Sequence, residues 1–322
     1  MSKPLVVTFG EALLRLSPPV AEPLRGATAL SLHVGGAEAN VAVGLASLGL
    51  AARYFGRLPA NDLGERVLGE LRRHGVDVSY VERGPERMGL YFLEEGVGPR
   101  PARVTYDRAG SAFAHVGEQG AAVALDAGLM GGASAFVTSG ITMALGAGPR
   151  AAAARLWRAA GTAGATRVYD VNFRSRLCTA AEAVAHAAPL LADAEVVVVA
   201  ERDALALHGG VPQLRAAAPR ALVVVTRGAD GATAHLPAGD VVEQPALGVA
   251  EAGRIGRGDA FLAGFLFGHL GGRGVAGSLA LGVASASLKS TWAGDLPDLR
   301  LADVEALADA AARGGPGTAV QR

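Results

Sequence analysis

The sequence predicts an α/β fold, a three-layer α/β/α sandwich with a mainly parallel central sheet. Half of the 322 residues are hydrophobic, which is enough for one large core. From residue 123 onward, short runs rich in β-branched residues alternate with longer runs of helical spacing. This alternation is typical of β-α units, whose strands lie parallel and whose helices cover both faces of the sheet. We therefore expect a single α/β domain over residues 1–322.

The first third of the chain contributes to this sheet and also leaves it twice. The expected strands are 5–10, 13–19, 31–34, 52–56, 87–94 and 102–108, and the expected helices are 41–50 and 62–74. A Gly- and Pro-rich turn joins the last two strands as an antiparallel pair. We expect two excursions, at about residues 12–34 and 87–112, to form a small separate β-sheet that acts as a lid.

The rest of the chain supplies the β-α units. The expected strands are 135–138, 167–171, 195–199 and 222–226, and the expected helices are 150–163, 180–191, 202–207, 260–270 and 277–289. In such folds, ligands bind beyond the carboxyl ends of the parallel strands. Ile141, Arg174 and Gly228 each follow a strand end, so we expect them to converge on one edge of the sheet.

A glycine-spaced turn leads into an apolar helix within residues 253–268. Gly256 and Gly258 let the backbone approach an anion closely, and a helix start exposes unpaired N–H groups with a partial positive charge. The turn can therefore bind a phosphate group, with the carboxylate of Asp259 beside it. A base next to a phosphate site is what phosphoryl transfer to a hydroxyl group needs. An ordinary helix start capped by Asp259 is the alternative.

Charge and cysteine content exclude several classes of protein. Thirty basic and thirty acidic residues cancel, so nothing suggests a nucleic-acid partner. The only lysines, Lys3 and Lys289, do not lie in a P-loop motif. Cys178 is the one cysteine, which excludes disulfide scaffolds and cysteine-based zinc sites. The N-terminus does not resemble a signal peptide, and the uncharged span 127–149 is rich in Gly, Ser and Thr, so we expect a cytosolic protein with no membrane partner.

Two glycine motifs are similar to known family signatures. Residues 35–40, Gly-Gly-Ala-Glu-Ala-Asn, and residues 253–259, Gly-Arg-Ile-Gly-Arg-Gly-Asp, resemble those of the ribokinase-like (PfkB) carbohydrate kinases, and the resemblance spans essentially the whole chain. Seven short segments further resemble the members that phosphorylate 2-keto-3-deoxygluconate. These segments are 89–92, 98–101, 106–109, 139–141, 170–174, 288–289 and 294–295. The resemblance implies a ribokinase-like fold, ATP and Mg²⁺ as cofactors, and phosphorylation of the 6-hydroxyl of a sugar acid.

The resemblance also implies residue roles. Asp259 is then the general base, and the backbone N–H groups of Gly256, Arg257 and Gly258 form an anion hole. The residues expected to bind the sugar acid are Gly36, Asn40, Tyr91, Tyr106, Arg108, Ile141, Arg174 and Asp295. The residues expected to bind ATP are Thr226, Gly228, Gly231, Gly256 and Gly258. A guanidinium binds a carboxylate through a planar fork, so Arg108 and Arg174 suit a 2-keto acid better than a neutral sugar. Solvated surface charges are the alternative for these arginines, and core packing is the alternative for the two tyrosines.

Departures from the family pattern leave other functions open. The first Asp of the second signature is Gly253, for which Glu251 is a candidate substitute, and the usual Ala is Arg257. The family's magnesium motif Asn-x-x-Glu reads Ala-Glu-Arg-Asp at residues 200–203, so the metal ligands stay unassigned. One alternative is a PfkB kinase for a neutral sugar such as fructose or ribose, and another is a sugar-binding homologue that has lost catalysis. A homodimer formed through the lid is also expected.

Overall fold

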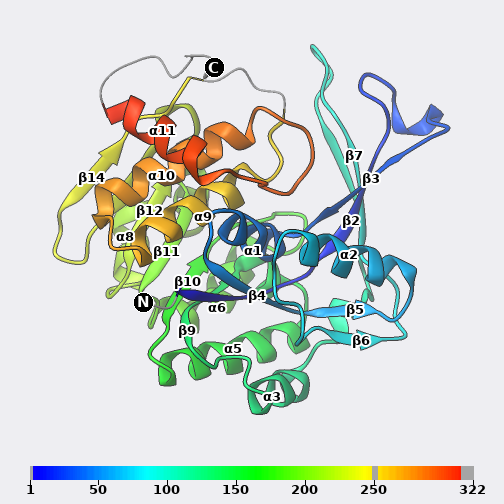
Figure 1. Ribbon diagram of the computed structural model, residues 1–322, viewed down its shortest axis with the longest axis horizontal. Coiled ribbons are helices and arrows are strands. Elements are labelled where there is room, and N and C mark those ends of the chain that lie inside the picture. Colours follow the sequence, from blue (N-terminus) through cyan, green and yellow to red (C-terminus); the bar gives the residue numbers. More distant parts are fainter. Residues whose placement is uncertain (1–2, 249–252, 313–322) are drawn as a thin grey trace.

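An eight-stranded sheet forms the centre of the computed structural model, which describes residues 3–248 and 253–312. The strand order is β14-β13-β12-β11-β10-β9-β1-β4 (Figure 1). These strands are β1 (Leu5–Phe9), β4 (Ala51–Phe55), β9 (Ala133–Ser139), β10 (Thr166–Asp170), β11 (Val196–Ala200), β12 (Leu222–Thr226), β13 (Ala232–His235) and β14 (Val241–Gln244). Neighbouring strands pair in parallel from β12 to β4, while β13 and β14 pair antiparallel. The mainly parallel sheet predicted from the sequence is confirmed.

Helices cover both faces of this sheet, because its strands are apolar on both sides. In β11, Val196 and Val198 enter one hydrophobic cluster and Val197 and Val199 enter the other. The first cluster packs under α1 (Ala37–Ser47), α2 (Asp62–Arg73), α9 (Arg257–Leu270) and α10 (Gly274–Lys289). The second packs under α3 (Glu118–Asp126), α5 (Ala147–Thr162), α6 (Ala180–Leu191), α7 (Glu201–His208) and α8 (Val211–Ala217). The three-layer sandwich is therefore confirmed as well.

A second sheet, in the order β3-β2-β7-β8, projects from the main body at the upper right of Figure 1. Its strands are β2 (Leu13–Ser17), β3 (Ser31–Gly35), β7 (Leu90–Glu94) and β8 (Arg103–Asp107). They come from the two excursions expected from the sequence. The small separate sheet is thus confirmed, whereas its action as a lid stays a prediction. A two-stranded pair, β5 (Arg57–Pro59) and β6 (Glu82–Gly84), lies below α2 in the same view.

Several elements differ from the expectation. Helix α9 begins at Arg257, so the cap is Gly256 and Asp259 lies inside the first turn, which excludes Asp259 as the N-cap. Strand β7 begins at Leu90, because Arg87 makes an isolated bridge with Ser111 before it. Elements absent from the sequence prediction are β5, β6, α3, α4 (Gly140–Ala144), α8, β13, β14, α11 (Leu301–Ala312) and the short 3-10 helices η1 (Leu24–Gly26), η2 (Ala112–His115) and η3 (Gly228–Asp230). Most of these elements are short, and their residues carry weak periodicity.

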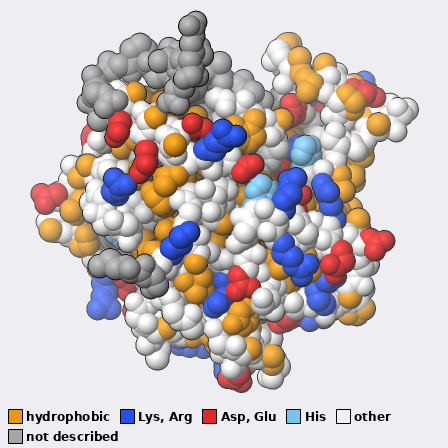
Figure 2. Space-filling model, viewed as in Figure 1, with side chains coloured by type: hydrophobic (Ala, Val, Ile, Leu, Met, Phe, Trp, Pro, Cys, Tyr) orange, Lys and Arg blue, Asp and Glu red, His pale blue; other side chains and the backbone are white. Residues whose placement is uncertain are grey.

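The surface in Figure 2 carries acidic and basic side chains interspersed over the visible face, with no field of one sign. This agrees with the equal numbers of the two charges in the sequence. Within residues 3–248 and 253–312, none of the helices combines the length and apolarity needed to span a bilayer.

Candidate active site

A cleft of about 950 Å³ lies between the small sheet and the carboxyl ends of the parallel strands. Most of the predicted site residues line it: Gly36, Asn40, Tyr91, Tyr106, Arg108, Ile141, Arg174, Thr226, Gly256, Arg257, Gly258, Asp259 and Asp295. These positions span most of the chain, so the fold brings together what the sequence separates. Gly228 and Gly231 are not among the lining residues of this cleft. Ligand contact by each lining residue stays a prediction.

The turn before α9 requires glycine at one of its two key positions. Gly256 has φ +77°, and a Cβ added there would lie 2.1 Å from the carbonyl oxygen of Asp295. Only glycine fits such a position without a shift of the backbone. A Cβ on Gly258, in contrast, meets no atom within 4 Å apart from its own chain neighbours and the backbone of its own helix. The space beside Gly258 therefore opens to the cleft, and the first N–H groups of α9 point beyond the helix by its geometry, as an anion hole needs.

Asp259 lies at this helix start and is held by a residue from the other end of the chain. The Nδ2 amide of Asn40 donates a hydrogen bond to Asp259 Oδ2 at 2.6 Å. Asn40 belongs to the first turn of α1, and its side chain is buried. Its Oδ1 atom has no hydrogen-bond partner among the described residues. The amide thus fixes the carboxylate of Asp259 and keeps an acceptor in the wall of the cleft.

Burial changes the acidity of the carboxyl groups in the cleft. It raises the pKa of Asp259 to about 7, against the opposing effects of the Asn40 hydrogen bond and the Arg174 charge. Burial, followed by the negative charge of Asp259, raises the pKa of Asp170 to about 8. A carboxyl group with a pKa near neutrality suits a general base at physiological pH.

We expect kcat/KM to rise with pH through about pH 7, because Asp259 accepts a proton only when ionised. The groups that act on its charge are Asn40, Glu38, Arg174 and Asp295, together with Asp170, which interacts with Asp259 electrostatically. A pH–rate profile from about pH 5.5 to about pH 8.5 checks this, with the folded fraction measured at each pH. A flat profile over that range would contradict the assignment of Asp259 as base.

Arg108 is paired with a carboxylate of the protein itself. Its Nε donates to Glu11 Oε2 at 2.7 Å, and its Nη2 contacts the same oxygen. Ser111 donates to the other oxygen, Glu11 Oε1, at 2.6 Å. Glu11 is buried and lines the cleft. Its residue type and its position in the sequence did not predict that it would pair with Arg108. The sequence predicted a solvated or substrate-bound cation at Arg108, whereas the structure shows a third state, a largely buried ion pair.

Asp295 is engaged in the same way by two residues of the small sheet. Tyr91 donates its hydroxyl to Asp295 Oδ1 at 2.5 Å, and Arg15 Nε donates to Oδ2 at 2.7 Å. Arg15 was not predicted as a site residue. The ring of Tyr106 lies 6.0 Å from that of Tyr91, centroid to centroid. These contacts join β2 and β7 to the main body at the edge of the cleft, and Tyr106 of β8 packs on Tyr91 of β7.

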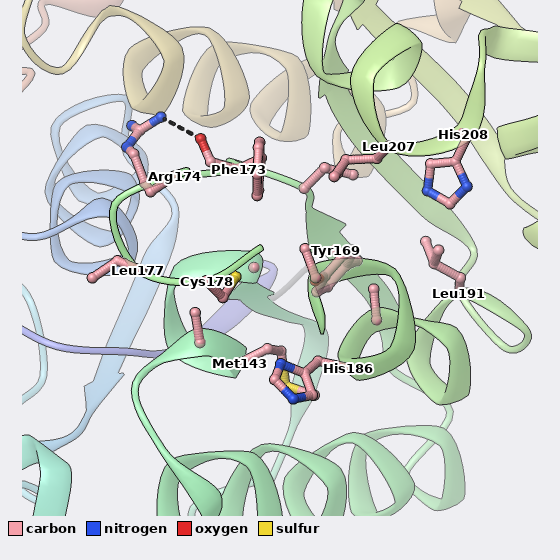
Figure 3. Close-up of a pocket in the computed structure, with 15 residues that line it drawn as sticks. Met143, Tyr169, Phe173, Arg174, Leu177, Cys178, His186, Leu191, Leu207 and His208 are labelled. Atoms are coloured by element: carbon pink, nitrogen blue, oxygen red, sulfur yellow. Dashed lines mark hydrogen bonds between the residues drawn. The ribbon is translucent and has the colours of Figure 1, made fainter. Parts of the chain in front are cut away.

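Arg174 follows β10 through a strained turn. Asn172 has φ +35°, which is uncommon for a residue other than glycine, and its amide donates to Asp170 Oδ2 at 3.0 Å. Arg174 Nη1 donates to the carbonyl of Phe173 at 3.3 Å, the contact drawn in Figure 3. Arg174 lines the main cleft and also a small cavity of about 10 Å³, room for about one water molecule. Its charge raises the ionised fraction of Asp259.

Thr226 lines the part of the cleft expected to hold ATP, and so do Ala200, Arg202 and Asp203. Gly231 is outside it, and a Cβ there would meet the Gln244 carbonyl at 2.1 Å, so its glycine is explained by packing. Asp170 and Asp203 both line the cleft, and Mg²⁺ that arrives with a nucleotide often takes one or two carboxylates and keeps several waters. Among the described residues, no group of three or more metal-ligating side chains occurs. Glu251, the candidate substitute in the second signature, lies outside the described residues.

The family model described as pfkB family carbohydrate kinase matches residues 3–299. The chain belongs to the PfkB carbohydrate kinase family. This confirms the family resemblance on which the residue roles were based.

Relatives of this PfkB kinase act on several sugar acids and related compounds. The chain is 40% identical over 307 residues to the 2-dehydro-3-deoxygalactonokinase of Haloferax volcanii, covering 93% of this chain and 95% of the relative. It is 28% identical to the 5-dehydro-2-deoxygluconokinase of Shouchella clausii, covering 88% of each. The crystal structure of 2-dehydro-3-deoxygluconokinase from Thermotoga maritima is 32% identical, with a TM-score of 0.84 over 95% of this chain and 98% of that one.

Proposed function

We propose that this PfkB kinase transfers the γ-phosphoryl group of ATP to the 6-hydroxyl of a 2-keto-3-deoxy sugar acid such as 2-keto-3-deoxygluconate. The observation that carries the proposal is the position of Asp259. Its carboxylate stands in the first turn of α9, held by Asn40, in a cleft that Arg174 also lines. The similarity to kinases of two keto-deoxy sugar acids supports the same substrate class.

In the proposed reaction, Asp259 accepts the proton of the sugar hydroxyl while the oxygen of that hydroxyl attacks the γ-phosphorus. The new O–P bond forms while the bond between the γ-phosphorus and the bridging oxygen breaks, and ADP leaves with that oxygen. The N–H groups of Gly256, Arg257 and Gly258 stabilise the charge on the phosphoryl oxygens. Asp170 and Asp203 would hold Mg²⁺, which when bound neutralises phosphate charge. Arg174 orients the acid end of the sugar.

A neutral sugar is the second candidate substrate, and one observation favours it. Glu11 already neutralises Arg108. Of the two arginines expected to bind the acid group, Arg174 is therefore the one without a carboxylate partner among the described residues. Loss of catalysis is the third reading, based on Gly253 and Arg257. Detectable ATP-dependent turnover of any sugar would exclude it.

We expect the enzyme to prefer 2-keto-3-deoxy sugar acids over fructose and ribose by roughly 10- to 100-fold in kcat/KM. A guanidinium left without its carboxylate loses a charge-assisted hydrogen bond worth about 1.5–3 kcal/mol. ADP release across a panel of keto-deoxy sugar acids and neutral sugars measures this. A higher kcat/KM for a neutral sugar would overturn the sugar-acid assignment and leave a PfkB kinase of the second kind. The dimer through the small sheet and the cytosolic location stay predictions.

A further inference from the structure

Lys289 is a buried cation that the proposed reaction does not use. It is the last residue of α10, and its side chain is fully buried. Its ammonium donates to the carbonyl of Trp292 at 3.3 Å and to that of Gly294 at 3.0 Å, and it lies 5.2 Å from the centre of the Trp292 ring. Among the described residues it forms no ion pair with a carboxylate. Burying an ammonium is costly, so its presence here calls for a physical reason.

The surroundings show how this charge is tolerated. The C-terminal end of a helix carries a partial negative charge, which favours a cation at the last residue of α10. Two carbonyl acceptors and the face of an indole ring add to this stabilisation. Burial still lowers the pKa of Lys289, while the negative charges of Asp295 and Asp259 act in the opposite direction. The cation therefore stands within the field of the catalytic carboxylate.

The position of Lys289 relative to the glycine turn explains what the cation does. A Cβ added to Gly256 would lie 3.3 Å from Lys289 Cε and 2.1 Å from the Asp295 carbonyl, so both form the floor under this turn. The N–H of Gly253 donates to the Ser290 carbonyl at 3.0 Å, which ties the start of the turn to the end of α10. The segment after α10 thus packs against the turn that forms the proposed anion hole. That segment contains the two carbonyls that the ammonium binds.

We propose that Lys289 is a positioning residue for phosphoryl transfer, which holds residues 292–295 against Gly256 and thereby keeps the anion hole and Asp259 in place. The inference rests on the proposed kinase reaction. Lys289 touches neither substrate nor nucleotide in this arrangement. Its effect is expected on the transition state, where the N–H groups of the turn matter, more than on the binding of either substrate.

The test replaces Lys289 by methionine, which has similar length and volume and no charge. We expect kcat to fall about 10-fold, while KM for the sugar acid and for ATP stays within about twofold. Lys3→Met, at the only other lysine of the sequence, is the matched control and should leave kcat and both KM values unchanged. In Lys289→Ala, added ethylammonium should restore part of kcat, whereas the same concentration of sodium ion should not.

Each result decides the proposal. An unchanged kcat in Lys289→Met, or equal changes in kcat and both KM values, overturns the positioning role. Failure of both variants to fold, seen by circular dichroism, also overturns it and makes Lys289 a purely structural residue. The wild-type enzyme is assayed first. Absence of turnover with every sugar acid would contradict the proposed function. An active wild type together with an unchanged kcat in Lys289→Met would contradict only the positioning role of Lys289.

Discussion

Asp259→Asn is expected to lower kcat by about 10²–10⁴-fold, the usual contribution of a general base. Asparagine has nearly the same shape as aspartate, and its side-chain oxygen can still accept the hydrogen bond from Asn40 Nδ2. It cannot take up the proton of the sugar hydroxyl. The fold and the binding of ATP should therefore survive while the chemical step slows.

A coupled assay of ADP release, together with thermal unfolding, measures both parts of this expectation. Asp62→Asn is a matched control, because Asp62 is an exposed aspartate in the first turn of another helix, α2. That control should retain the wild-type rate. If Asp259→Asn also turned over within about threefold of the wild type, Asp259 would not be the base, and the reaction proposed for this cleft would have to be rebuilt around another group.

The strands of the main sheet were predictable because each is a short, continuous apolar run. The run at 222–226 gave β12 with the same bounds, and its neighbour β11 differed by one residue. Burial on both faces produces such a run in any parallel sheet, whatever the ligand. The glycine turn before α9 was also visible, since a positive φ beside a close backbone contact leaves little choice but glycine.

The pairing of charged side chains was not predictable. Asn40 meets Asp259 across 219 residues, Glu11 meets Arg108 across 97, and Arg15 meets Asp295 across 280. A single sequence shows residue types and local spacing, and neither identifies partners so far apart along the chain. The sequence therefore suggested that Arg108 could bind a substrate carboxylate, although in the fold Arg108 is already paired with Glu11.

The sequence also did not show whether a glycine in a turn serves ligand binding or packing. Gly231 and Gly256 both have positive φ, and both would clash with a backbone carbonyl if they carried a Cβ. Gly256 lies in the cleft, whereas Gly231 packs against the end of β14. Their local sequence signals are the same, so only the tertiary contacts separate the ligand turn from the structural turn.

Because Glu11 holds Arg108, we expect recognition of a sugar acid to depend mainly on Arg174. We expect Arg174→Ala to raise KM for a 2-keto-3-deoxy sugar acid by about 10- to 100-fold, the loss of a charged hydrogen bond of about 1.5–3 kcal/mol. KM for ATP should change less than about threefold. Arg174→Lys keeps the charge without the planar fork and should give an intermediate value.

The decisive quantity is the preference for the acid over a neutral sugar, because a general disturbance of the cleft lowers both activities alike. In Arg174→Ala this ratio of kcat/KM values should collapse toward one. Arg158→Ala, which removes an exposed arginine on α5, is the control and should leave the ratio unchanged. If Arg174→Ala kept the preference, the acid group would be bound elsewhere, and Arg108, whose Nε and Nη2 contact Glu11, would become the next residue to test through its Nη1 group. A fall in the ratio would show that one guanidinium beyond the end of β10 gives this kinase its selectivity for acids.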